Sequence, residues 1–371
     1  MSHKTIFKLL FLLSTIYLAA LPFKIMPLLY MLRIPSLLLI VMLVIKQYNK
    51  TQARFTMSVM VMCGIFIFHF IVDTPITIEL LVSAFSLVAY LLLIIISENF
   101  YIDQSTKKFI NMCSIAAAMI LLVYSQAPWG HKASFEGDVF ITSYLTYGYD
   151  NSNFAGIVTL SVLSLIYITK DTAGKKTKFV CWIFELLLFY CIYKTNTRSA
   201  FAVAILIPVF NILLHKIHLK NWFIAVICLI PFLFVPFYLY LSGTGGADNI
   251  QIMGKGAMSG RQFVYEEYLA RLDKTYEWIV GDFAGSKLHN AHNGPLAILT
   301  STGILGCIAY FNIFLTKLFC ANKRATSHLN RLAVFIIVAC FLNTCGEAAL
   351  LLGGFPLIIY LFTFFIFAYS K

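Results

Sequence analysis

The chain has 371 residues, of which 60% are hydrophobic and 12% are charged, and its mean hydropathy is +0.84. A water-soluble domain could not bury so much apolar surface, so the composition excludes a soluble enzyme and indicates a polytopic membrane protein. The formal net charge is +12, but the basic residues are spread over separate short loops, which argues against a nucleic-acid-binding surface.

Runs of about 20 apolar residues recur along the whole chain, and a run of that length can cross a bilayer as a helix. Twelve segments qualify: 6–22, 26–45, 55–72, 76–97, 109–125, 154–169, 179–194, 199–214, 222–241, 295–315, 332–345 and 355–370. The first could imitate a signal peptide, but Lys24 and a second apolar run follow it at once, so we expect it to be retained. We predict an all-α fold, a single integral membrane domain over residues 1–371 with about 12 transmembrane spans.

The basic residues alternate with the acidic ones from loop to loop. Short loops that carry Lys and Arg stay in the cytoplasm. The basic connections contain Lys46, Lys50, Arg54, Lys107, Lys108, Lys170, Lys175, Lys176, Lys178, Lys216, Lys220, Lys317, Lys323, Arg324 and Arg331. We therefore expect these connections and both termini to be cytoplasmic, and the acid-rich loops to lie outside a bacterial inner membrane.

All nine cysteines fall in or beside the predicted spans, and none forms a Cys-x-x-Cys pair. Buried thiols of this kind behave as small apolar side chains. We expect no metal site, no cofactor and no disulfide.

Two external loops are long enough to build a site, residues 126–153 and 242–293. The second opens with the glycine-rich stretch 242–246, and charged and apolar residues then alternate at helical spacing over 266–272. We expect an amphipathic helix here, so that this periplasmic loop is partly helical and lies over the bundle.

The end of the second loop holds a histidine at the start of a predicted span. Pro295 favours the first turn of a helix and leaves His292 and Asn293 just before it. A helix N-terminus disfavours a charged imidazole and attracts anions, so a neutral, proton-accepting His292 beside a bound phosphate is physically coherent. A surface histidine that only forms hydrogen bonds is the alternative, and His289 is a further candidate.

Arg198 lies in a break between two apolar runs that is too short for a free loop, which places it in a tight external turn. It is either an interfacial anchor or an anion-binding group, and we favour the second because charge at membrane depth is usually functional. A guanidinium group matches phosphate with a planar fork of donors. Neighbouring Lys194 either assists it or extends toward the interface.

A second arginine and two carboxylates complete the set of candidates. Arg261 follows Gly260, and the residues alone favour an ordinary solvated arginine there. Glu347 lies at an external helix end and could orient a group of the site, whereas Glu185 lies within a span and is a candidate helix-packing partner. External aromatic residues favour the interfacial belt, although those of the second loop could contact sugars.

Several short motifs resemble those of the O-antigen ligase and polymerase superfamily. They are Asp150-Asn151-Ser152-Asn153-Phe154-Ala155-Gly156, Thr197-Arg198-Ser199-Ala200, Ser259-Gly260-Arg261, and Ala291-His292-Asn293 followed by Thr302-Gly303-Ile304-Leu305-Gly306. Gly281-Asp282-Phe283 stands where the family often has Gly-x-Gly. The resemblance covers roughly positions 150 to 350, and it lies in the order of the motifs rather than in overall identity.

The resemblance implies transfer of glycans from undecaprenyl diphosphate without a metal. His292 would take the proton from an acceptor hydroxyl, while Arg198 and Arg261 hold the departing diphosphate. Supporting roles fall to Asn153, His289, Asn293, Glu347 and Lys194. Membrane lipids, and the chain-length regulator and flippase of the same pathway, are the expected partners.

We expect an O-antigen polymerase in lipopolysaccharide biosynthesis. An O-antigen ligase is the alternative, because it uses the same donor and differs only in its acceptor, the lipid A-core. A flippase or transporter of lipid-linked oligosaccharide ranks third, since the candidate residues gather outside the spans rather than along a passage through them.

Overall fold

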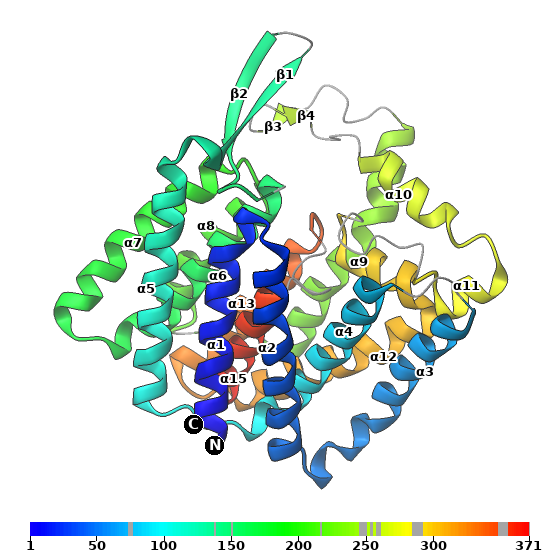
Figure 1. Cartoon of the computed structure of the whole chain (residues 1–371), viewed down its shortest axis with the longest axis horizontal. Helices are drawn as coiled ribbons and strands as arrows, with labels where there is room; N and C mark the ends of the chain where they lie inside the picture. The colour runs from blue at the N-terminus through cyan, green and yellow to red at the C-terminus, as the bar shows by residue number, and fades with distance from the viewer. Residues whose placement is uncertain are drawn as a thin grey trace.

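We analysed a computed structural model of the chain, which describes all residues except 73–76, 137–138, 150, 216, 245–250, 253–254, 257–260, 284–291, 348–354 and 371. The long helices form one bundle (Figure 1). They are α1 (His3–Ala20), α2 (Met26–Gln47), α3 (Thr56–Val72), α4 (Ile78–Ile96), α5 (Gln104–Gln126), α6 (Ser152–Thr169), α7 (Lys175–Lys194), α8 (Arg198–Leu213), α9 (Asn221–Gly243), α12 (Gly294–Arg324), α13 (His328–Asn343) and α15 (Phe355–Tyr369). The short helices α10 (Arg261–Ala270) and α11 (Thr275–Val280) precede α12.

A helix lies over each of the twelve predicted spans, because an apolar run in a bilayer can satisfy its backbone polar groups only within itself. Among the described residues, 8 helices are long and apolar enough to cross a membrane, whereas α8, α13 and the 357–369 part of α15 are shorter apolar helices. The structure thus fits a helical membrane protein. The count of twelve spans and the sidedness of the loops stay predictions.

The basic connections gather at one end of the bundle, where α1 begins and α15 ends (Figure 1). We call this the terminal end and the opposite one the distal end. Three hydrogen bonds join connections there: Lys46 Nζ to the Met1 carbonyl at 2.8 Å, Gln104 Nε2 to the Thr172 carbonyl at 3.1 Å, and Asn322 Nδ2 to the Leu219 carbonyl at 2.8 Å. The basic connections, which alternate with acidic loops along the sequence, therefore lie together at one end of the bundle.

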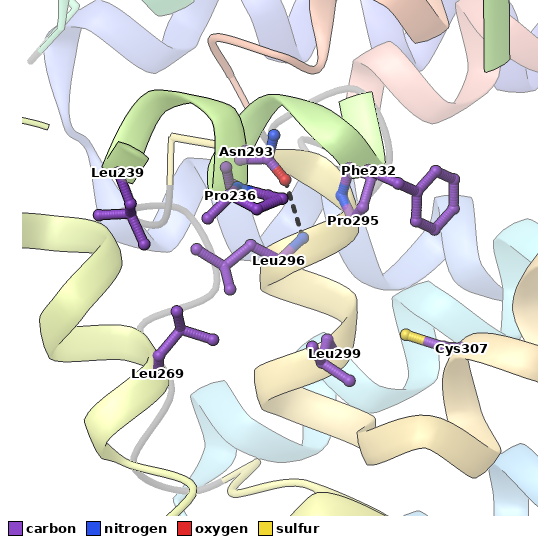
Figure 2. A pocket seen from close by; sticks show the side chains of 10 residues that line it. Phe232, Pro236, Leu239, Leu269, Asn293, Pro295, Leu296, Leu299 and Cys307 are labelled. Atoms are coloured by element: carbon purple, nitrogen blue, oxygen red, sulfur yellow. Dashed lines mark hydrogen bonds between the residues drawn. The ribbon is translucent and has the colours of Figure 1, made fainter. Parts of the chain in front are cut away.

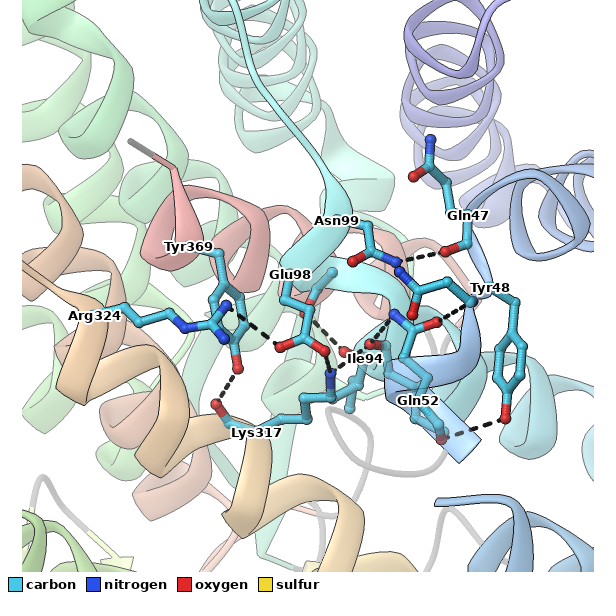
Figure 3. A network of polar contacts seen from close by, with 12 residues as sticks. Gln47, Tyr48, Gln52, Ile94, Glu98, Asn99, Lys317, Arg324 and Tyr369 are labelled. Carbon is cyan, nitrogen blue, oxygen red and sulfur yellow. Dashed lines mark hydrogen bonds and ion pairs between the residues drawn. The ribbon is translucent and has the colours of Figure 1, made fainter. Parts of the chain in front are cut away.

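A buried polar network closes the terminal end (Figure 3). Lys317 of α12 is fully buried, and its ammonium pairs with Glu98 of the 3-10 turn η3 (Ser97–Asn99) at 2.7 Å. The same ammonium donates to the carbonyl oxygen of Ile95 at 2.6 Å. The hydroxyl of Tyr369 donates to the carbonyl oxygen of Lys317 at 2.6 Å. Because a buried ion pair is tolerated only when hydrogen bonds complete it, this network fixes α4, α12 and α15 to one another.

Two antiparallel hairpins, which the sequence analysis did not predict, lie in the two long loops. β1 (His131–Glu136) pairs with β2 (Val139–Leu145), and β3 (Gln251–Ile252) pairs with β4 (Lys255–Gly256). The β1–β2 hairpin projects beyond the distal end of the bundle (Figure 1). The predicted amphipathic helix is present as α10, which contacts α9 and α12.

Helix α11 and a kink in α12 interlock through their backbones. Gly303 has φ 63° and ψ −170°, a conformation that is essentially restricted to glycine, and it interrupts α12. A side chain on Gly303 would collide with the backbone of Ile279, and one on Gly281 would collide with the backbone of Ser301. The amide of Asp282 donates to the carbonyl oxygen of Thr300 at 2.7 Å. The two glycine motifs of the sequence therefore meet in one backbone contact.

Replacing Gly303 with alanine is expected to destabilise the protein, because the required backbone conformation alone costs about 1–3 kcal/mol and the added methyl group has no space. Thermal unfolding of the purified protein in detergent measures the effect as a lower midpoint. Gly64→Ala in α3 is the matched control, since a side chain there meets nothing within 4 Å. Equal midpoints for the two variants would contradict the interlock.

Candidate functional site

The start of α12 is built as the sequence predicts. Asn293 is the N-cap of this helix, its Oδ1 accepts from the amide of Leu296 at 2.9 Å, and Pro295 lies in the first turn. The Asn293 side chain is fully buried and its Nδ2 donates to the carbonyl oxygen of Pro231 at 3.0 Å. Asn293 thus anchors the helix start on α9. His292 precedes it with φ 49°, an uncommon conformation for a residue with a side chain and one often found at functional sites.

Glu347 holds His292 and Asn153 together at the distal end. Nδ1 of His292 lies 3.1 Å from Oε1 of Glu347, and Nδ2 of Asn153 donates to the same oxygen. The Glu347 side chain is 5% exposed, whereas that of His292 is 25% exposed. Because an ionised carboxylate can only accept, a neutral His292 carries its proton on Nδ1 and keeps a lone pair on Nε2. Glu347 can therefore hold the His292 ring in one orientation, with Nε2 available as a base. Hydrogen-bond partners commonly orient functional histidines in this way.

The two candidate arginines lie close together beside this group. A side chain on Gly346 would meet Nη1 of Arg261 at 3.2 Å and Oγ of Ser199 at 3.1 Å, so the residue before Glu347 lies against both. The charges of Arg198 and Arg261 are near enough to repel each other. Two guanidinium groups that lie close together can share an anionic ligand, because each offers a planar fork of donors.

The first two family-like motifs pack on each other. A side chain on Gly156 of α6 would lie 2.7 Å from the Thr197 side chain, so only glycine permits this approach. The Thr197 hydroxyl donates to the carbonyl oxygen of Ser152 at 3.0 Å. The contact fixes the start of α8, with Arg198 in its first turn, against the start of α6, which carries Asn153.

Tyr265 is a residue of this region that the sequence analysis assigned only to the external aromatic residues. It is fully buried, and its ring lies 5.4 Å from that of Tyr238 in an edge-on arrangement. Burial raises the pKa of Tyr265, while the nearby Arg261 lowers it. Its position four residues after Arg261 in α10 was the available signal, because such residues share a helix face.

Two buried amide oxygens lie next to the arginines in sequence. Among the described residues, Oδ1 of Asn196 and Oε1 of Gln262 accept no hydrogen bond. Buried polar atoms are usually paired, and exceptions concentrate where a ligand or water binds. Asn196 lies two residues before Arg198, and Gln262 follows Arg261, so both unpartnered oxygens belong to the segments that carry the candidate arginines.

An apolar cavity of 410 Å³ lies between α9, α10 and α12 (Figure 2). Its walls come from Phe232, Val235, Pro236, Leu239, Leu269, Asn293, Pro295, Leu296, Leu299 and Cys307. Asn293 and Pro295 join the cavity directly to the segment that carries His292. A hydrocarbon chain suits such apolar walls.

The structure does not bring every candidate to this site. Lys194 is exposed and its ammonium lies 5.5 Å from the ring centroid of Tyr190, which fits a side chain that extends along the surface. Glu185 lies outside this site and pairs with Lys170 at 2.9 Å, a contact between α7 and the end of α6 that fits the expected helix-packing partner. His289 lies outside the described residues, as do parts of the motifs: Asp150, Ser259, Gly260 and Ala291.

No family model matches the chain, and no curated protein matches it. The functional interpretation therefore rests on the geometry of the site.

Proposed function

We propose that this protein is an O-antigen polymerase of a bacterial inner membrane, which joins undecaprenyl diphosphate-linked oligosaccharide units at the periplasmic face. The observation that carries the proposal is the meeting of four separate segments at the distal end. They supply Asn153, Arg261, His292 and Glu347. Arg198 lies near enough to Arg261 for their charges to interact. Because the basic connections lie at the terminal end, we assign that end to the cytoplasm and the distal end to the periplasm.

The reaction needs a proton acceptor, positive charge on the leaving group and a place for lipid. Nε2 of His292 accepts the proton of the attacking hydroxyl as that oxygen bonds to the anomeric carbon of the donor sugar. The bond from this carbon to the diphosphate oxygen breaks, and its electron pair leaves with undecaprenyl diphosphate. Attack opposite the leaving group inverts the anomeric centre. Arg198 and Arg261 stabilise the charge that develops on the diphosphate.

The apolar cavity beside Asn293 supports a lipid-linked substrate. Its apolar lining between helices suits the first isoprene units, while the diphosphate stays beside the arginines. The unpartnered oxygens of Asn196 and Gln262 suit hydroxyl groups of a sugar, because each can accept a hydrogen bond. In this arrangement the lipid chain would contact apolar residues, the diphosphate would contact arginines, and the sugar would contact hydrogen-bond acceptors.

Deletion of the gene tests the proposal through the surface lipopolysaccharide, separated by gel electrophoresis. A polymerase defect leaves lipid A-core that bears a single repeat unit, because export and ligation continue while chain growth stops. Complementation with the wild-type gene restores the ladder. An unchanged ladder in the deletion strain would contradict a role in this polysaccharide.

The same gel separates the two alternatives. A ligase uses the same site and donor but transfers to lipid A-core, so its loss leaves core without any repeat while long lipid-linked chains accumulate outside. Loss of a flippase also leaves bare core, but lipid-linked single units then accumulate on the cytoplasmic side. Extraction of lipid-linked material from each compartment distinguishes these two results.

A further inference from the structure

A second cavity shares no lining residue with the cavity beside Asn293. It measures 550 Å³ and lies between three consecutive helices, α6, α7 and α8. Its lining residues are Leu163, Tyr167, Lys170, Trp182, Glu185, Leu186, Phe189, Ala204 and Pro208. Lys170 begins the connection between α6 and α7, which belongs to the terminal end, so the cavity extends from that end into the bundle.

The walls of this cavity open toward the side of the bundle. Leu186 is 75% exposed and Trp182 is 51% exposed although both line it. Ala204 is small, and Pro208 lies inside α8, where it removes a backbone hydrogen bond. In a membrane the medium at such an opening is lipid, so an acyl chain is the molecule that this apolar space meets.

Part of the cavity lining is an ion pair that has no net charge. The Lys170 ammonium lies 2.9 Å from Oε1 of Glu185 and 3.8 Å from the ring centroid of Tyr167. The side chains of Lys170 and Glu185 are only 12% and 11% exposed. Since each charge is neutralised by the other, the pair tolerates an apolar chain beside it.

The connection between α6 and α7, which begins at Lys170, carries excess positive charge. Lys178 pairs with Asp171 at 2.5 Å. Lys175 and Lys176 are exposed in the first turn of α7, and no ion pair involves either of them among the described residues. Two cations without an ion-pair partner among the described residues thus follow a few residues after Lys170 of the cavity lining.

We propose that this cavity binds an anionic phospholipid, with an acyl chain between α6, α7 and α8 and the phosphate on Lys175 and Lys176. Charge complementarity selects the headgroup, and the lateral opening admits the chain. The inference does not depend on the glycan chemistry at the distal end. A site of this kind makes lipid composition a determinant of how firmly α7 and α8 are held together.

Native mass spectrometry of the full-length protein tests this, after exchange into nanodiscs that contain phosphatidylglycerol and phosphatidylethanolamine in equal amounts. Phosphatidylglycerol is expected to be retained preferentially by the released protein. The variant Lys175→Gln/Lys176→Gln should weaken this retention, because each lysine near an anionic headgroup contributes on the order of fivefold in affinity. Lys220→Gln/Lys323→Gln is the matched control, since these exposed lysines lie on other connections at the same end.

A second variant moves retention in the other direction. Glu185→Gln keeps the shape of the side chain and an oxygen for Lys170 but removes the negative charge, so phosphatidylglycerol should be held more tightly. Size-exclusion chromatography restricts the measurement to folded protein. Equal retention of both lipids by the wild type, or an identical loss in the lysine variant and its control, would overturn the proposal.

Discussion

His292→Ala protein is expected to fold and insert like the wild type but to transfer glycan about a hundred to ten-thousandfold more slowly, the range that a positioned general base contributes. The imidazole makes its one described side-chain contact with Glu347, at 3.1 Å, and the His292 side chain is 25% exposed. The helix start is held by Asn293 instead. Loss of the ring therefore removes chemistry rather than structure.

The measurement is single-turnover transfer between lipid-linked oligosaccharides by purified protein, accompanied by a donor-binding assay. His292→Ala should still bind the donor, because its role begins when the acceptor is deprotonated. His131→Ala is the matched control, since this histidine lies in the other distal loop and its Nε2 donates to the Ser125 carbonyl at 2.9 Å. Transfer at the wild-type rate by His292→Ala would remove the general-base assignment.

Loss of either arginine is expected to slow transfer on the order of a hundred to a thousandfold, as removal of one donor to a developing anion typically does. Arg198→Ala and Arg261→Ala should also weaken donor binding, because the diphosphate carries its charge before the reaction begins. This binding defect separates them from His292→Ala. Lysine at either position should be intermediate, since it supplies charge without the planar fork of a guanidinium.

Arg271→Ala provides the comparison within the same loop. Arg271 follows α10 and pairs with Glu267 at 2.5 Å, outside the group around Glu347. Its loss should leave transfer and donor binding unchanged. If Arg261→Ala behaved like Arg271→Ala, the diphosphate-binding role of Arg261 would be wrong and its proximity to Ser199 would be structural.

Local features of the bundle could be predicted because their signals lie close together in the sequence. The N-cap Asn293 before Pro295, the tight turn before Arg198 and the helical spacing of α10 are each set by a few neighbouring residues. The β1–β2 hairpin was missed although Val139–Leu145 is rich in β-branched and aromatic residues.

The partners within the site could not be predicted, because they depend on packing between distant segments. Glu347 lies 55 residues from His292 and 194 from Asn153, and no sequence periodicity relates them. The resemblance to a family placed the motifs in order but did not indicate which atoms meet. In the same way, Gly281 and Gly303 could be noted as motifs, whereas their backbone contact depends on how α11 crosses α12.

The kink at Gly303 sets the distance between the start of α12, which follows His292, and the terminal end. A straight helix with the 31 residues of α12 would be about 46 Å long, whereas the hydrocarbon core of a bilayer is about 30 Å thick. An unbroken α12 anchored by Lys317 would place its first residue about 35 Å from that anchor along a straight axis. The bend turns the first segment of α12 aside, so the helix start beside His292 lies nearer to the terminal end than a straight helix would place it.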